Sequence, residues 1–186
     1  DLAAKLGEPP LQEPEALKRI DRMHGALEWQ MHIKTIEQLD RLLDDLLSLS
    51  RLEMKPHLDG GARVDLNEVV RAVVDTLAPM AAEAKVAIEV NAPMGDVVVT
   101  GDRDELFQVV QNLVENACKY GRSGGRVIVS TGIASDGGGE LAVTDFGPGI
   151  PAEHIPRITE RFYRVEPENG RMEKGTGLGL AIVKHI

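Results

Sequence analysis

The chain has 186 residues, of which 42% are apolar, 27% are charged and 3% are aromatic, and its formal net charge is −9. This length and apolar share predict a folded protein with a substantial core. The negative charge, without any cluster of Lys and Arg, argues against nucleic acid as a partner. Cys118 is the single cysteine, which excludes an intrachain disulfide and fits a reducing compartment.

The N-terminal part of the chain predicts mostly helix. Residues 1–8 are expected to form a short helical tail, and the prolines within residues 9–14 predict a turn. Residues 15–53 contain no proline and repeat apolar residues at helical spacing, which predicts one long helix of a bundle or coiled coil. The apolar stripe changes phase near residues 31–36, as a stutter would, or a junction between sequences of different origin.

The rest of the chain predicts a second domain that begins at about Arg63, after a linker at residues 58–62. Asp65 and Asp102 are each expected to cap a helix, because an aspartate at such a position accepts a hydrogen bond from a free backbone N–H. The expected elements are helices at 65–84, 102–120 and 177–186, and strands at 86–90, 97–100, 126–133 and 140–145. This order predicts an α+β fold, a two-layer α/β sandwich.

Four short motifs follow one another in this second domain. They read NLVENACKY at 112–120, DFGPGI at 145–150, RFYRV at 161–165 and GTGLGL at 175–180. In this order they resemble the N, G1, F and G2 boxes of sensor histidine kinases, and the sequence around residues 44–51 is similar to the PhoR type. The resemblance implies a Bergerat-type ATP-binding domain at residues 63–186, truncated at its C-terminus, preceded at 1–57 by part of a helical-hairpin dimerisation and phosphotransfer region.

The helix at 102–120 presents the first group of candidate site residues. Asn112 and Asn116 are four residues apart and so share one helical face, with Lys119 and Tyr120 close to it. Amide oxygens suit magnesium, and a lysine ammonium suits phosphate. The resemblance implies that Asn112 and Asn116 bind the metal, that these two residues and Lys119 are catalytic, and that Tyr120 contacts nucleotide. A solvated helix face is the alternative.

Asp145 ends an apolar strand beside a glycine-rich turn. There its carboxylate could accept a hydrogen bond from an amino group on a buried ring. The resemblance implies contact with the adenine amino group, with Gly147, Gly149 and Ile150 nearby. An aspartate that only caps the turn is the alternative. Phe146 stands where the family often has asparagine, which puts some nucleotide contacts in doubt.

The glycines at 175–179 lead into a helix, whose N-terminal N–H groups favour phosphate. The resemblance implies a phosphate loop formed by Gly175, Thr176, Gly177, Leu178, Gly179 and Leu180. The polar residues 151–174 are expected to form a lid over the nucleotide, with Phe162 as an apolar anchor and Arg164 or Lys174 reaching phosphate. A surface loop is the alternative.

In the family, the first hairpin helix carries a histidine followed by a carboxylate and then a proline, and this histidine accepts the phosphoryl group. His24, His32, His57, His154 and His185 do not match that pattern. We therefore expect the acceptor to lie upstream of Asp1.

Three functions follow as hypotheses. The first is the kinase module of a two-component sensor, which uses ATP and Mg²⁺, forms a homodimer through a helical bundle and passes phosphate to a response-regulator receiver domain. It would be the cytosolic portion of a membrane-anchored parent. The second is an ATPase of the gyrase, Hsp90 and MutL type, which Asn112 argues against because those enzymes have an acidic base there. The third is a nucleotide-binding regulatory or dimerisation module without autokinase activity.

Overall fold

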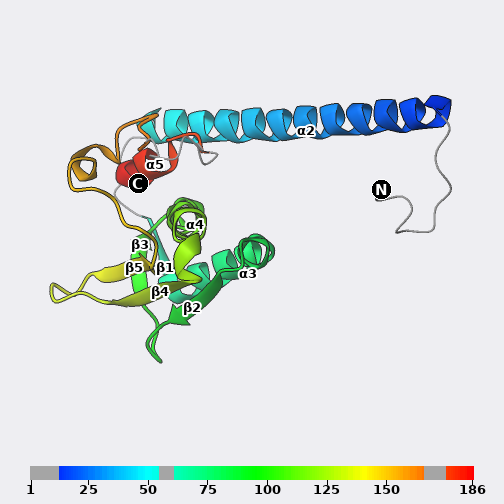
Figure 1. Ribbon diagram of the computed structural model, residues 1–186. Helices are drawn as coiled ribbons and strands as arrows, with labels where there is room; N and C mark the ends of the chain where they lie inside the picture. The colour runs from blue at the N-terminus through cyan, green and yellow to red at the C-terminus, as the bar shows by residue number, and fades with distance from the viewer. Residues whose placement is uncertain (1–12, 55–60, 166–174) are drawn as a thin grey trace. The chain divides into compact units, whose positions relative to one another are not determined.

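The computed structural model describes residues 13–54, 61–165 and 175–186, and the chain divides into two compact units, Asp1–Asp44 and Asp45–Ile186 (Figure 1). Helix α2 (Glu13–Met54) forms the described part of the first unit and ends inside the second. It confirms the long helix expected at 15–53. Pro14 is its second residue, a position where proline is tolerated because the first N–H groups of a helix have no partner within it. The tail expected at 1–8 lies outside the described residues.

The second unit contains two small sheets. In one, β1 (Ala62–Asp65) pairs antiparallel with β3 (Val98–Gly101). In the other, β4 (Arg126–Ile133) lies between β2 (Ala87–Asn91), to which it is parallel, and β5 (Gly139–Asp145), to which it is antiparallel. Helices α3 (Leu66–Ala84) and α4 (Arg103–Tyr120) cover one face of the strands (Figure 1). The predicted α+β two-layer sandwich is confirmed.

Aspartate caps start both of these helices. The Asp65 carboxylate accepts hydrogen bonds from the N–H of Asn67 at 3.0 Å and of Val97 at 3.1 Å. The Asp102 carboxylate accepts from the N–H of Asp104 at 2.9 Å. The predicted starts of α3 and α4 are therefore confirmed, and the Asp65 cap also ties α3 to the segment before β3.

The core lies between the helices and the three-stranded sheet. Alternate β4 residues, Val127 and Val129, are fully buried, as expected for a strand with one covered face. The other buried residues of this cluster are Val64, Val69, Val70, Val73, Leu77, Ala81, Val86, Val110, Val114, Ala117 and Cys118. Small and β-branched aliphatic residues dominate, which agrees with the low aromatic content.

One polar side chain is buried with them. Asn67 is 2% exposed; its Nδ2 donates to the Gly95 carbonyl at 2.9 Å and its Oδ1 accepts from the Thr131 hydroxyl at 2.5 Å. These bonds join α3 to β4 and to the loop before β3. A buried amide whose two ends are both satisfied stabilises the fold instead of weakening it.

Three details differ from the predictions. Strand β1 was not expected, and it begins at Ala62, within the residues assigned to the linker. The apolar period of the helix expected at 102–120 predicts an inward face of Leu106, Val109, Val110, Leu113, Val114 and Ala117. Val109 and Leu113 are only partly buried, whereas Cys118 is buried in the core and Phe107 packs against it. Helix α5 spans Gly179–His185 and so begins two residues later than expected, because Gly177 has φ +73°, which a right-handed helix does not allow. Among the described residues, no helix is both long and apolar enough to cross a membrane.

Candidate functional site

Helix α4 carries two predicted site residues that lie against the loop at 175–179. A Cβ atom at Gly179 would lie 2.8 Å from the Oδ1 atom of Asn112. At the other end of the loop, a Cβ atom at Gly175 would lie 2.6 Å from the Lys119 Nζ. The amide and the ammonium group therefore border the same glycine-rich backbone, and only glycine leaves them in place.

Tyr120 lies beside Lys119 at the same end of the loop at 175–179. We call the region formed by α4, Asp145 and this loop the corner. The Tyr120 hydroxyl accepts a 3.2 Å hydrogen bond from the Lys119 Nζ, which also lies 4.7 Å from the centre of the Tyr120 ring. The hydroxyl is 3.3 Å from the position of a Cβ atom at Gly175. The sequence predicted both residues here, and the structure brings them together with the loop.

Asp145 lies at the end of β5, against the C-terminal end of α4. A Cβ atom at Gly121 would lie 2.6 Å from the Asp145 Cβ, and one at Gly147 would lie 2.7 Å from the Tyr120 carbonyl oxygen. The Asp145 Oδ1 accepts a 2.9 Å hydrogen bond from the Gly147 N–H, which is the geometry of a turn-capping aspartate. Because that bond uses one oxygen, the exposed carboxylate retains its second oxygen as an acceptor.

Phe146 is held from two sides. The guanidinium of Arg126, at the start of β4, lies 4.1 Å from the centre of the Phe146 ring. Gly124 lies so close to Phe146 that a Cβ atom there would overlap it. Gly124 ends the short helix η1 (Arg122–Gly124), which directly follows α4. Phe146 thus links the turn after α4 to β5 and restrains the backbone next to Asp145.

Thr176 has two hydrogen bonds in the structure. Its hydroxyl donates to the Asp45 carboxylate at 2.7 Å and accepts from the Leu178 N–H at 3.2 Å. Leu178 is fully buried and packs with Ile182 of α5 and with Leu49. The hydroxyl of this predicted phosphate-loop residue is therefore engaged by a carboxylate in this conformation.

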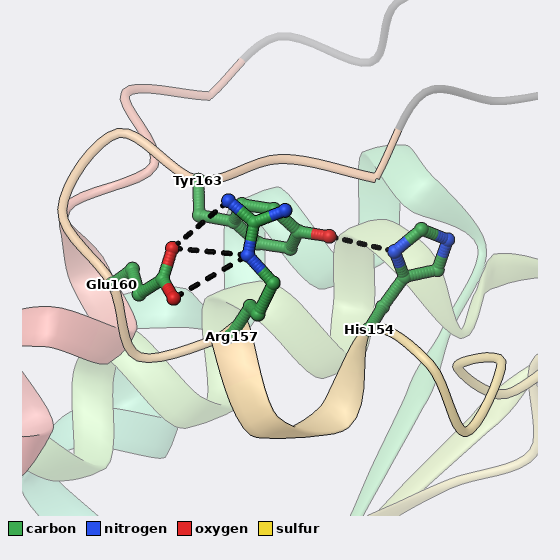
Figure 2. A network of polar contacts seen from close by, with 4 residues as sticks. All are labelled: His154, Arg157, Glu160 and Tyr163. Carbon is green, nitrogen blue, oxygen red and sulfur yellow. Dashed lines mark hydrogen bonds and ion pairs between the residues drawn. The ribbon is translucent and has the colours of Figure 1, made fainter.

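The segment at 151–165 contacts the same loop through its backbone. The Phe162 N–H donates a 2.9 Å hydrogen bond to the Gly177 carbonyl oxygen. Phe162 has φ +62°, and its side chain is 56% exposed. The next residue, Tyr163, belongs to a polar cluster with His154, Arg157 and Glu160 (Figure 2).

The remaining predicted residues differ in their exposure. Asn116, Arg164 and Leu180 are half-buried, and Ile150 and Gly149 are exposed. Lys174 lies outside the described residues. A hollow of about 180 Å³ lies on the sheet, but it is lined by Ser130, Thr131, Gly132, Glu140 and Ala142 and contains none of the predicted site residues. The candidate site is therefore defined by the close approach of α4 residues to the loop at 175–179.

Some contacts at this corner could not be read from the motifs. Gly121 and Gly124 make room for Asp145 and Phe146, and Arg126 covers the Phe146 ring. Asp45 contacts Thr176 across 131 positions of sequence. Only the high glycine content of residues 121–125 could have drawn attention to the turn after α4.

The arrangement has the chemistry of a nucleotide site. A helix amide and a lysine border a loop of backbone N–H groups, which suits a metal bridged to phosphates. A strand-end carboxylate, Asp145, lies beside the C-terminal end of the same helix, where it could accept from a purine amino group. The described residues contain no group of three or more His, Cys, Asp or Glu side chains that could hold a metal ion by themselves.

Comparison with known families agrees with this chemistry. Residues 101–186 match the family described as histidine kinase-, DNA gyrase B- and HSP90-like ATPases. This stretch includes α4, Asp145 and the glycine loop, and it begins next to Asp102, the cap of α4.

Relatives and solved structures cover more of the chain. The sensor histidine kinase RppB of Synechocystis sp. is 35% identical over 176 residues, which are 92% of this chain and 38% of that protein. A phosphate regulon sensor protein PhoR of Pseudomonas aeruginosa is 33% identical over 162 residues, covering 85% of this chain and 36% of PhoR. A structure of the mycobacterial sensor histidine kinase MprB is 35% identical to this chain, with a TM-score of 0.57. The match covers 67% of this chain and 76% of the chain in that structure.

The full-length structure of ShkA in complex with AMPPNP has 26% identity and a TM-score of 0.66, and it covers 95% of this chain and 34% of ShkA. The chain spans about two fifths of the length of the curated relatives that it matches first. From these likenesses, the chain belongs to the sensor histidine kinases and contains their ATP-binding domain.

Proposed function

We propose that this chain binds ATP and Mg²⁺ at the corner formed by α4, Asp145 and residues 175–180, and that it is the kinase module of a two-component sensor. In this proposal the γ-phosphoryl group passes to a histidine and then to an aspartate of a response regulator. The domain division goes with it: a dimerisation and phosphotransfer region at 1–57, a linker from residue 58 that ends where β1 begins at Ala62, and the ATP-binding domain from β1 to residue 186. The parent protein would be membrane-anchored, with this portion in the cytosol.

One observation carries the proposal. Two residues of α4 that are seven positions apart, Asn112 and Lys119, border two glycines of one loop, Gly179 and Gly175. A nucleoside triphosphate needs a metal ligand, a cation and backbone N–H donors in one place, and this juxtaposition supplies all three. The complex of ShkA with AMPPNP supports it, since that relative covers nearly the whole of this chain.

The site residues would contact different parts of the bound nucleotide. Asp145 would accept from the adenine amino group through the oxygen that Gly147 does not use. Asn112 and Asn116 fit a magnesium ion, because their amide oxygens lie one helical turn apart and Asn112 faces the phosphate loop. The ion supplies charge neutralisation of the phosphates when bound. Lys119 would bind a phosphate oxygen beside Gly175.

Transfer to a protein group is favoured over hydrolysis. An ATPase of the gyrase type needs a base that activates water, and the corresponding position here is Asn112, whose amide cannot take up a proton. Its oxygen borders Gly179 as a ligand would. A phosphate-release assay tests this point: release by the purified chain at a rate similar to its phosphotransfer would favour the ATPase.

The partners are a second copy of the chain and a response-regulator receiver domain. Helix α2 leaves Ile36, Leu39, Leu43 and Leu46 between 37% and 61% exposed, at spacings of three, four and three residues. That spacing forms one apolar seam, as in helices that pair with each other. We propose that a second copy covers this seam.

A regulatory module without autokinase activity is the second candidate, because of the histidines of α2. His32 is exposed, but Ile33 and Lys34 follow it, so the residue after this histidine is not a carboxylate that could take up its proton. Radiolabel from γ-labelled ATP, with and without an added acceptor-helix fragment from a relative, separates the two functions. Label on the fragment supports the kinase, whereas nucleotide binding without transfer to any histidine supports the regulatory module.

Calorimetric titration with AMPPNP and Mg²⁺ tests the nucleotide site. We expect Asp145→Asn to abolish measurable binding, because an amide nitrogen would face the adenine amino group. Asp136→Asn is a matched control, since Asp136 caps the hairpin turn by an equivalent 2.9 Å bond from the Gly138 N–H but lies away from α4. Equal losses in both variants, or a folded wild-type chain that binds no AMPPNP, would contradict the proposal.

A further inference from the structure

Four residues between β5 and the glycine loop form one cluster around Tyr163 (Figure 2). The Tyr163 hydroxyl lies 2.6 Å from the Nδ1 atom of His154. The Arg157 guanidinium lies over the Tyr163 ring, 4.2 Å from its centre, and pairs with the Glu160 carboxylate at 3.1 Å. His154 directly precedes the short helix η2 (Ile155–Arg157) and Arg157 is its last residue, so this helix sets their spacing. We name these four residues the Tyr163 clip.

The clip fixes Tyr163 at three points. Its hydroxyl is held by His154, its ring by Arg157, and its backbone N–H by a 3.2 Å hydrogen bond to the Glu160 carbonyl. The side-chain hydrogen bond from Arg157 to the Glu160 carboxylate also raises the pKa of Arg157. All of these contacts span nine residues or fewer, so the clip forms within one local segment.

The residue next to the clip has an unfavourable backbone conformation. Phe162 has φ +62°, and among the described residues only Lys85, at the C-terminal cap of α3, shares a positive φ without being glycine. A side chain with a Cβ is strained there, so surrounding contacts must hold it. The Phe162 side chain is mostly exposed and contributes little to this restraint, whereas its neighbour Tyr163 is anchored.

The strained residue contacts the candidate phosphate loop directly. The Phe162 N–H donates to the Gly177 carbonyl, and a Cβ atom at Gly177 would lie 2.8 Å from the Phe162 carbonyl carbon. Gly177 itself has φ +73°. Two residues in the left-handed conformation are thus in backbone contact. The orientation of the Gly177 carbonyl therefore depends on the position of the Phe162 backbone.

We propose that Tyr163 is a positioning residue for the nucleotide phosphates. The clip holds Phe162 in its strained conformation, and Phe162 holds the Gly177 carbonyl. The Gly177–Leu178 peptide, whose N–H donates to the Thr176 hydroxyl, is thereby fixed, and the loop at 175–179 stays beside Asn112 and Lys119, where the phosphates would bind. This inference rests on the proposed nucleotide site and adds a group of residues that does not itself touch the ligand.

The first test compares ligands with and without phosphate. Tyr163→Phe keeps the ring under Arg157 and removes only the hydroxyl bonded to His154. We expect the dissociation constant for AMPPNP to rise roughly three- to tenfold, as for one lost hydrogen bond, while that for adenosine stays unchanged. His154→Ala should give the same selective loss, and the double variant should be no weaker than either single variant. Ile155→Ala replaces an exposed residue of η2 that belongs neither to the clip nor to the loop at 175–179. It is the matched control and should bind AMPPNP as the wild-type chain does.

The second test needs no nucleotide. Hydrogen exchange at the amides of residues 177–179 should accelerate in Tyr163→Phe, while exchange in β4 stays as in the wild-type chain. Unchanged exchange, or equal losses for AMPPNP and adenosine, would overturn the role of the clip even when the nucleotide site is intact. A wild-type chain that binds no AMPPNP would overturn the proposed function and this inference with it, whatever the exchange shows.

Discussion

The side-chain amide of Asn112 lies directly against Gly179, so that a Cβ atom on this glycine would be 2.8 Å from the amide oxygen. Gly179→Ala must therefore displace the amide. We expect the protein to remain folded, because a terminal side-chain group can move, while Mg²⁺-dependent AMPPNP binding weakens roughly tenfold, as expected for a misplaced metal ligand. Titration with Mg²⁺ and with EDTA measures the magnesium-dependent part.

Gly132→Ala is the control for this substitution, since no atom lies within 4 Å of a Cβ atom at Gly132. Magnesium-dependent binding that is unchanged in Gly179→Ala would argue against Asn112 as a ligand. A loss of AMPPNP affinity that is seen only in the magnesium-free titration would also argue against Asn112 as a magnesium ligand.

The sequence predicted which helix residues share a face better than it predicted the long-range contacts around them. The helical period alone placed Asn112 and Lys119 on one side of α4, and the aspartate caps gave the starts of α3 and α4. The two-residue error at α5 arose because the left-handed φ of Gly177 depends on its contact with Phe162, which no local pattern reveals.

The missed strand has a similar cause. Strand β1 is only four residues long, and its partner β3 lies about 35 residues away along the chain. So short a segment carries too little alternation to be distinguished from a linker. The core face of α4 was likewise misjudged at Val109 and Leu113, because burial depends on which elements cover a helix as well as on its period.

The contact between Thr176 and Asp45 predicts a gain of affinity. Asp45→Ala frees the Thr176 hydroxyl and removes a negative charge next to the candidate phosphate loop. We expect AMPPNP to bind roughly two- to fivefold more tightly, as expected for the removal of a partly exposed repulsive charge. Asp44→Ala removes the same charge from the exposed neighbouring position and is the control. Weaker binding in Asp45→Ala would show that the contact supports the loop instead of competing with phosphate.

Asn67 predicts a loss of stability without a loss of function. Asn67→Ala removes both ends of the buried amide network and leaves the Gly95 carbonyl and the Thr131 hydroxyl without this partner. We expect the free energy of unfolding to fall by about 2 kcal/mol. Urea denaturation measures it. The exposed Asn91 provides the control, because Asn91→Ala should change stability by less than about 0.5 kcal/mol. AMPPNP affinity of the folded fraction should be unchanged in both variants.

Cys118 predicts a dependence of stability on pH. Burial raises the pKa of its thiol, and the nearby negative charge of Glu115 raises it further. Below the ordinary thiol pKa of about 8.5, both the folded and the unfolded chain keep the proton, so stability is unaffected. Above this pKa, the thiol of the unfolded chain ionises while the buried thiol keeps its proton. Ionisation stabilises the unfolded state, so the free energy of unfolding falls with rising pH.

Urea denaturation of the wild-type chain and of Cys118→Ala between about pH 8 and about pH 10 isolates this effect. All other ionisable groups are shared, so the wild-type chain should lose stability more steeply than the variant. Parallel pH curves would contradict a raised thiol pKa. Alkylation of the native wild-type chain should also be slow until denaturant is added, since the thiol is 1% exposed.

The apolar seam of α2 predicts a dimer that one charge disrupts. Leu39 is 60% exposed in a single chain, so Leu39→Glu should leave the monomer folded. In a paired helix the same carboxylate would be buried without a partner, which strongly destabilises the pair. Light scattering should give about twice the 20.2 kDa chain mass for the wild type and the chain mass for the variant. Arg41→Glu adds a carboxylate at an exposed position of the same helix that does not belong to the seam, and it should remain dimeric. A monomeric wild type, or a Leu39→Glu chain that is still dimeric, would mean that this seam does not pair two copies.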